Sequence, residues 1–455
     1  MKRLLSTGVL LALACAAFVS ASAQSQSNRE VLNAWLKAYN AGDDASLMSF
    51  EQKYFGDSNI AFAHDSREET GGLELVKIES EEPLKLSALL KEHDSAALWE
   101  ATLTRTSADA AKLSNLAYRA LPMPQAGAVA ALDTFASKLD RLDKFSGVLL
   151  VKKGNTILFR KAFGLADRAS GAPVTLDTRF YFASQGKMFT AVSVLQLVAD
   201  GKVSLDDPIG KYLTDYPNAE VARKVTVREL LTHRGGTGEM SILEAKDTQN
   251  RAWVRSISDI IKLNGARGPA FEPGTKMDYS NYGFILLGAL VEKVSGKSYY
   301  DYVDSHIFKP AGMLHTSFPL REEPNGIAIG YTQADGKLVS SMDQLPWRGT
   351  PAGGGVSTAD DMARFVSALN AGKLLSPAML TEATKVQSKW YGYGFITSGL
   401  DGFPYWGHGG GAPGNSLVLD YYPVTDTTFV CMANRDPPVC DRLAFNWLFR
   451  SPKAP

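Results

Sequence analysis

The chain is poor in cysteine and carries no excess of either charge. It has three cysteines in 455 residues, and 48 Lys and Arg side chains balance 48 Asp and Glu side chains. A neutral total provides no long-range field to collect nucleic acid or anionic lipid, so small-molecule or peptide partners are expected. The 45% of hydrophobic residues can build a large core, which excludes a small disulfide scaffold and a wholly disordered chain.

An apolar run near the N-terminus is too short for a convincing membrane span. Residues 4–19 follow a charged start and precede Ala21-Ser22-Ala23. This pattern predicts a signal peptide over 1–23 and export to the periplasm or the medium, with no integral membrane span after its removal. A lipid-attachment role for Cys15 is the alternative. The mature chain then keeps Cys431 and Cys440, which form either a disulfide across a short loop or two separate buried thiols.

The first part of the mature chain has a helical segment followed by strand-like runs. Residues 27–42 place apolar side chains at helical spacing, and three partly alternating runs follow at 73–79, 85–92 and 98–104. A helix before a curved meander resembles the NTF2-like (SnoaL-like) cone fold, which implies a small α+β domain over 24–120. No polar constellation stands out there, so packing, homodimer formation or substrate gating is expected of it.

Two prolines and a glycine predict a linker over 121–134, before a second domain over 135–455. Strands are predicted at 145–151 and 156–163, and a long apolar helix runs from Ser184 to about residue 200. Thr226 and Glu229 form a capping-box pattern in the helical region that follows. Further strands are predicted at 393–395, 414–421 and 427–433, and a helix at 441–449. This order predicts an α+β domain in which both ends of the chain segment contribute strands to one sheet, with a helical region inserted between them.

The first chemical motif is Ser184-Gln-Gly-Lys187 at the start of that long helix. The spacing places the hydroxyl and the amine on one face, one turn apart. A lysine held partly neutral by burial can take the serine proton, and the helix N-terminus favours a developing oxyanion. Alone the motif is weak, because an exposed helix start has the same residues.

Two further motifs follow in order. Tyr279-Ser280-Asn281 comes shortly after a Pro-Gly turn, and His408-Gly-Gly-Gly411 lies in a predicted strand where glycines let a ligand approach the backbone. Together the three resemble the signatures of the serine β-lactamase and penicillin-binding-protein superfamily, on its class C β-lactamase and esterase branch. The resemblance covers about residues 135–450 and implies a β-lactamase/transpeptidase-like fold.

The resemblance assigns roles to individual residues. Ser184 would be the acylated nucleophile, Lys187 its proton partner, and Tyr279 the general base, either as a phenolate or by proton relay with Lys187. Asn281 would bind the substrate amide. The backbone N–H groups of Ser184 and Gly411 would form the oxyanion hole.

The main departure from the family pattern is His408, which stands where the family has lysine, with Gly409 in place of threonine. His408 and Gly410 are expected to contact substrate, but a histidine and a glycine bind a substrate carboxylate less well than lysine and threonine. The remaining histidines show no metal-ligand spacing and are interpreted as structural, with His233 a cation at a helix end. They are His64, His93, His233, His306 and His315. No metal, nucleotide or other cofactor is expected.

The resemblance therefore implies an exported serine hydrolase that forms an acyl-enzyme on Ser184. Esters or D-amino-acid-containing peptides are the first expectation for its substrates. The alternative is β-lactamase or DD-peptidase (penicillin-binding) activity, which the change at His408 and Gly409 disfavours. A more remote alternative is a binding or regulatory module that keeps the fold without catalysis.

Overall fold

The computed structural model describes residues 26–56, 59–107, 112–240, 254–323, 326–400 and 403–453. The chain divides into two compact units. Among the described residues, the first comprises those within 26–93 and 98–119, and the second comprises those within 94–97 and 120–453. The expected signal peptide and Cys15 lie outside the described residues.

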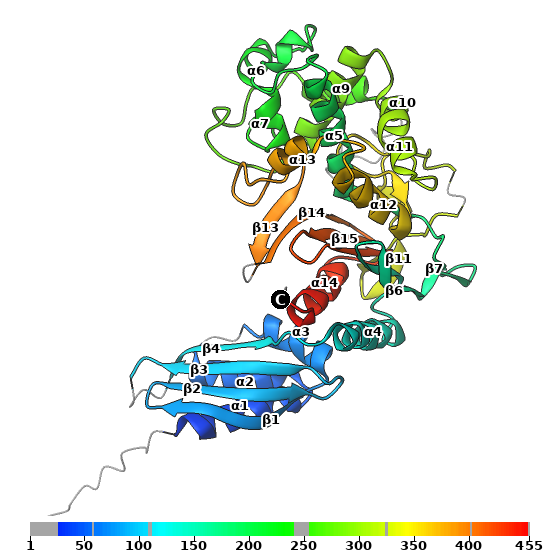
Figure 1. Ribbon diagram of the computed structural model, residues 1–455. Coiled ribbons are helices and arrows are strands. Elements are labelled where there is room, and N and C mark those ends of the chain that lie inside the picture. The colour runs from blue at the N-terminus through cyan, green and yellow to red at the C-terminus, as the bar shows by residue number, and fades with distance from the viewer. Residues whose placement is uncertain are drawn as a thin grey trace, which may run out of the picture. The chain divides into compact units, whose positions relative to one another are not determined.

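The first unit has three helices followed by a four-stranded sheet in the order β1-β2-β3-β4 (Figure 1). The predicted helix is α1 (Asn28–Asn40), which begins with a capping box between Ser27 and Glu30. The three predicted strands are also present, whereas α2, α3 and β4 were not predicted from the sequence. The bounds are α2 (Asp44–Tyr54), α3 (Ala61–Thr70), β1 (Leu73–Glu82), β2 (Lys85–Glu92), β3 (Leu98–Arg105) and β4 (Leu113–Ala120).

A buried hydroxyl cluster joins α1 and α3 to strand β4. The hydroxyl of Tyr39 lies 3.1 Å from Ser66 Oγ and 3.1 Å from Thr70 Oγ1. Ser66 Oγ is also 3.2 Å from the hydroxyl of Tyr118. Ser66 and Thr70 are one helical turn apart on α3, but Tyr39 and Tyr118 come from distant segments, so local spacing does not identify the cluster. Their hydroxyls satisfy one another, which lets them be buried at low cost.

The second unit is built on a six-stranded sheet of order β13-β14-β15-β16-β5-β6. As predicted, both ends of the domain supply it, because Gly147 of β5 pairs with Ala433 of β16. The strand expected at 393–395 begins only at Ile396, since Gly394 adopts a left-handed turn (φ +76°). The bounds are β5 (Gly147–Lys153), β6 (Thr156–Phe163), β13 (Ile396–Leu400), β14 (Phe403–Ala412), β15 (Asn415–Tyr422) and β16 (Thr427–Ala433).

Helices cover both faces of this sheet (Figure 1). On one face, α4 (Gln125–Arg141) and α14 (Val439–Arg450) bury their apolar side chains against β5, β15 and β16. Helix α4 occupies most of the segment predicted to be a linker, over 121–134. Its apolar positions Ala128, Leu132 and Phe135 follow helical spacing and are buried. The prolines that suggested a linker precede the helix, where Pro124 is the N-cap.

The helical region between β6 and β13 packs on the other face. Helices α5 and α9 form its buried centre, with 11 of the 14 residues of α5 and 10 of the 15 residues of α9 buried. The predicted capping box is present at the start of α7, where Thr226 and Glu229 bond reciprocally. The helices are α5 (Gly186–Ala199), α6 (Ala219–Lys224), α7 (Val227–Leu231), α8 (Ile257–Asn264), α9 (Asn281–Ser295), α10 (Tyr299–Val303), α11 (Lys309–Ala311), α12 (Ala359–Asn370) and α13 (Pro377–Ala383).

Short strands and one covalent bridge complete the unit. A disulfide joins Cys431 of β16 to Cys440 of α14, so the alternative of two separate thiols does not hold. Within the described ranges, no helix combines the length and the apolar character needed to cross a membrane. The short strands are β7 (Leu165–Asp167), β8 (Ala172–Pro173), β9 (Phe180–Tyr181), β10 (Tyr331–Ala334), β11 (Lys337–Ser340) and β12 (Val356–Ser357).

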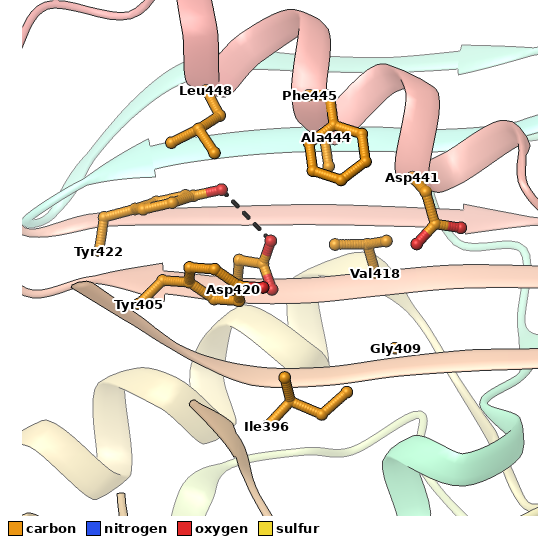
Figure 2. Close-up of a pocket in the computed structure, with 10 residues that line it drawn as sticks. All are labelled: Ile396, Tyr405, Gly409, Val418, Asp420, Tyr422, Asp441, Ala444, Phe445 and Leu448. Carbon is orange, nitrogen blue, oxygen red and sulfur yellow. Dashed lines mark hydrogen bonds between the residues drawn. The ribbon is translucent and has the colours of Figure 1, made fainter. Parts of the chain in front are cut away.

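A small cavity of about 90 Å³ lies between α14 and the sheet (Figure 2). Asp420 on β15 and Asp441 on α14 both line it, together with Tyr405 and Tyr422. The Tyr422 hydroxyl donates to Asp420 Oδ2 at 3.2 Å. Burial raises the pKa of Asp420 to about 7, and the nearby Asp441 carboxyl adds to the rise. Asp420 is therefore largely protonated in the folded protein below neutral pH.

Replacing this carboxyl is expected to change how stability depends on pH. Between about pH 4 and pH 7 the folded state keeps the Asp420 proton that the unfolded state releases, so the free energy of unfolding falls as pH rises. At about 1.4 kcal/mol per pKa unit, the loss reaches up to about 4 kcal/mol at neutral pH. Asp420→Asn keeps a hydrogen-bond acceptor and removes this loss. Urea unfolding at pH 5 and pH 8 measures the difference.

The matched control is Asp335→Asn in the turn between β10 and β11. Asp335 is exposed and has φ +49°, a conformation that asparagine tolerates. This variant should keep the pH dependence of the wild type. An equal loss of stability from pH 5 to pH 8 in wild type and Asp420→Asn would contradict the assignment.

Candidate active site

Ser184 lies in a tight turn between β9 and α5. Ala183, just before it, has φ +42°, a left-handed conformation that costs a non-glycine residue about 1–2 kcal/mol. The turn is held from outside: Phe182 N donates to Gly355 O at 2.8 Å, and a Cβ on Gly353 would lie 1.9 Å from Ala183 O. Gly353 must therefore be glycine for this loop to approach the turn. The result is a partly buried Ser184 on a rigid support.

Lys187 is one turn further along and is 0% exposed. Its Nζ lies 3.1 Å from Ser184 Oγ, 2.6 Å from Asn281 Oδ1 and 2.8 Å from Ala352 O. The amine also sits 4.8 Å from the ring centre of Tyr279. Burial lowers the pKa of Lys187 to about 7, although the charge of Glu239 opposes the shift.

The three contacts of Lys187 direct its lone pair. Ala352 O is a carbonyl oxygen and Asn281 Oδ1 an amide oxygen, so both only accept hydrogen bonds. A neutral amine has two N–H bonds, which these two oxygens take up. Its lone pair then faces Ser184 Oγ, the one of the three partners that has a proton to give. The geometry suits proton transfer from serine to lysine.

Tyr279 and Asn281 flank the N-cap of α9. Ser280 is the N-cap, and its Oγ accepts from Gly283 N at 3.0 Å, which fixes the residues on either side of it. A side-chain hydrogen bond joins Tyr279 to Ser184. Burial raises the pKa of Tyr279 well above its usual value of 10, so this phenol stays protonated at neutral pH.

His233 packs against Tyr279, a contact that the sequence did not reveal. The ring centres are 4.2 Å apart, and His233 Nδ1 accepts from Ser280 N at 3.1 Å. Burial, helped by the charges of Lys187 and His408, holds the pKa of His233 well below its usual range. His233 has the structural role expected from the sequence, but as a buried neutral imidazole, so the favourable site for a cation at the helix end is not used. It supports the Tyr279 ring and the backbone of the Tyr-Ser-Asn motif.

His408 is turned into the core of the second unit. Its side chain is 2% exposed, and Nε2 lies 2.8 Å from the Tyr391 hydroxyl. Nδ1 lies 2.5 Å from Gly409 O, which can only accept, so the proton is on Nδ1 and Tyr391 donates to Nε2. Burial lowers the pKa of His408 to about 3. The expected contact between His408 and substrate is not available in this geometry, because the strand alternation directs its side chain inward.

Gly410 and Gly411, which follow on β14, have different structural roles. A Cβ on Gly410 would lie 3.0 Å from Phe182 O and 2.9 Å from Leu417 Cδ1, so Gly410 lets β14 approach the Ser184 turn rather than facing substrate. Gly411 lines the cleft together with Ser184. β13 pairs with β14 only as far as Gly407, and among the described strands none covers that edge beyond it.

The cleft has a volume of about 740 Å³, a size that suits a small-molecule or short peptide substrate. Ser184, Asn281 and Gly411 open into it, whereas Lys187 and Tyr279 lie behind the serine. The described lining residues include one charged side chain, that of Asp343. They are Tyr181, Ala183, Ser184, Met240, Ile260, Asn281, Asp343, Gln344, Leu345, Pro346, Thr350, Ala352, Gly353, Gly354, Gly411, Ala412, Pro413 and Asn415.

Comparison with known proteins places this geometry in a family. The sequence profile of the Beta-lactamase family matches residues 133–448. The chain belongs to that family. The match begins after the first unit, and no family assigns the antiparallel sheet of that unit.

Relatives within the family have several activities. "Esterase EstB" of Burkholderia gladioli is 31% identical over 328 residues, which are 62% of this chain and 82% of that one. The structure of a penicillin-binding protein from Bacillus halodurans is 32% identical with a TM-score of 0.63, over 68% of this chain and 97% of that one.

A D-stereospecific amidohydrolase from Streptomyces sp. is 27% identical with a TM-score of 0.60, over 69% of this chain and 97% of that one. Among four curated relatives, the chain spans 62% to 82% of their own lengths. The chain is a serine hydrolase of the Beta-lactamase family, with esterase-like, amidase-like and penicillin-binding-protein-like relatives. Within the described residues, no group of three or more His, Cys, Asp or Glu could hold a metal ion.

Proposed function

We propose that this protein is an exported hydrolase that forms an acyl-enzyme on Ser184 and cleaves esters or D-amino-acid-containing peptides and amides. The observation that carries the proposal is the Lys187 amine, buried at 3.1 Å from Ser184 Oγ with its other two contacts to oxygens that only accept. An amine with a pKa of about 7 is half neutral at neutral pH. It can therefore act as the base that serine requires.

In the proposed first step, Ser184 Oγ attacks the substrate carbonyl carbon while its proton passes to Lys187 Nζ. The N–H groups of Ser184 and Gly411 stabilise the resulting oxyanion, and Asn281 holds the acyl side. Tyr279 donates its phenolic proton to the leaving alcohol or amine and regains a proton from Lys187. Water then attacks the acyl-enzyme with the same groups, releasing the acid and restoring Ser184.

This assignment moves the role of general base from Tyr279 to Lys187. Burial lowers the pKa of the lysine and raises that of the phenol, so the lysine loses its proton first. Between the two alternatives for Tyr279, the shifts favour the proton relay over the phenolate. The raised phenol pKa suits a group that donates a proton to a leaving group.

Hydrolysis of β-lactams or of D-Ala-terminated peptides is the second candidate, supported by the similarity to penicillin-binding proteins. Both kinds of substrate carry a carboxylate that needs a cationic partner. No basic side chain lies among the described residues that line the cleft, and His408 is buried and neutral. Ester or amide hydrolysis is therefore the better-supported activity.

The test uses the wild-type chain with p-nitrophenyl butyrate. We expect p-nitrophenol release with a stoichiometric burst when acylation outpaces deacylation. Treatment with a p-nitrophenyl alkylphosphonate should then block turnover and add one phosphonyl group to the peptide that contains Ser184, as located by mass spectrometry. The intact mass of the exported sample reports whether the chain begins at Gln24. Absent turnover, or an adduct on another residue, would overturn the proposal.

A further inference from the structure

Two carboxylates lie in or beside the cleft. Asp343 is the charged residue among the described lining residues, and its side chain is exposed. Glu239 lies next to the cleft: its Oε2 accepts from Asn281 N at 3.1 Å, and its Oε1 accepts from Met240 N at 2.8 Å. Asn281 and Met240 both line the cleft. The carboxylate of Glu239 is thus fixed against two residues of the wall.

No basic side chain is among the described residues that line the cleft. Arg321 contacts its wall through Nη1, which donates to the backbone oxygen of Leu345 at 3.2 Å. Lys187 is fully buried behind Ser184 and is half neutral at neutral pH. The charge of Glu239 raises the pKa of both Lys187 and Tyr279, opposing burial in the first and adding to it in the second. The negative field of Glu239 therefore reaches the atoms around Ser184.

We propose that the cleft selects acyl substrates that carry a positively charged group, with Asp343 and Glu239 supplying the selecting charges. The substrate class is an ester or amide with an ammonium group on its acyl part. This inference rests on the proposed acyl transfer at Ser184 and adds the charge of the substrate to it. An opposite charge held within several Å of a carboxylate at a partly screened site corresponds to about a tenfold gain in binding.

Three p-nitrophenyl esters test the selection. The 4-(trimethylammonio)butanoate is cationic, and the 5,5-dimethylhexanoate is its neutral carbon isostere, with the same shape. The adipate monoester is anionic. We expect kcat/KM to be about tenfold higher for the cationic ester than for its neutral isostere, with the anionic ester slowest. The preference should lie mainly in KM and should shrink at 1 M salt, because salt screens exposed charges.

Two variants test whether Asp343 and Glu239 cause the preference for the cationic ester. Asp343→Asn removes a carboxylate whose side chain makes no ion pair among the described residues, and Glu239→Gln keeps an acceptor for Asn281 N. Each should lower the ratio of cationic to neutral kcat/KM severalfold. The control is Asp200→Asn at the far end of α5, whose 14 residues place it about 20 Å from Ser184. The control should keep the wild-type ratio, since Asp200 pairs with Lys202 at the surface.

The outcomes separate the two levels of the proposal. Ser184-dependent cleavage of the neutral ester, with no preference for the cationic isostere, would overturn the charge selection and leave the proposed function standing. A preference that survives in both Asp343→Asn and Glu239→Gln would overturn the assignment to these residues. If none of the three esters is cleaved, acyl transfer itself has failed, and the charge selection fails with it.

Discussion

Ser184→Ala is expected to lower kcat on a short-chain p-nitrophenyl ester by about 10⁴-fold or more. Among the described residues, this hydroxyl is the nucleophile that contacts both Lys187 Nζ and Tyr279 and also opens into the cleft. Without it no acyl-enzyme forms, and only the remaining donors of the cleft can assist attack by water. Steady-state release of p-nitrophenol measures the loss, and a burst should be absent.

The fold should survive this substitution. Alanine fits the short helix Ala183–Gln185, and Ser184 is only partly buried. The variant should keep the circular dichroism spectrum and the thermal midpoint of the wild type within a few degrees. Residual turnover near the wild-type rate in a folded Ser184→Ala protein would contradict the nucleophile assignment.

Lys187→Met is expected to lower kcat/KM by about 10²- to 10⁴-fold, the range for loss of a general base. Methionine fills much of the same space without an amine, so packing against Phe284 and Tyr279 is retained. In the wild type, kcat/KM should rise with pH through about 7, because the ammonium form must lose its proton before it can accept one from serine. The residual kcat/KM of the variant should not show this rise with pH, hereafter called the limb of the pH profile.

Two further variants check that the limb belongs to Lys187. Glu239→Gln removes a charge that raises the pKa of Lys187, so the limb should move to lower pH. Lys202→Met replaces an exposed lysine beyond the end of α5 and should change neither the rate nor the profile. A pH profile in Lys187→Met with the same limb near pH 7 would assign that ionisation to another group.

Local patterns in the sequence were sufficient to predict much of this architecture. The hairpin of β5 and β6, the long helix α5 and the sheet drawn from both ends follow from alternation, turn residues and periodicity. The long helix begins at Gly186, two residues after the predicted start at Ser184. The linker predicted over 121–134 is mostly helix α4. Its prolines precede the helix, but in the sequence they were interpreted as signs of an irregular connection. Helix α4 owes its stability to a sheet face formed far away in the sequence.

The catalytic motifs were predictable because each is short and its members are close in sequence. The environment that sets their protonation was not, because it depends on burial by distant segments. Ala352 O, which orients the Lys187 amine, comes from a loop more than 150 residues later. His408 shows the same limit: position in a motif suggested substrate contact, whereas strand alternation and Tyr391 place its ring in the core.

The pairing of β5 with β16 has a consequence for how the molecule acquires activity. Gly147 pairs with Ala433, so the middle of the sheet closes only after nearly the whole domain has been synthesised. Such high contact order slows folding and keeps the emerging chain without its central strand partner. The Ser184 turn rests on β14, which belongs to the same late segment. We therefore expect a nascent chain to be inactive until its C-terminal strands have been synthesised. Catalysis then begins only after synthesis of the domain is almost complete.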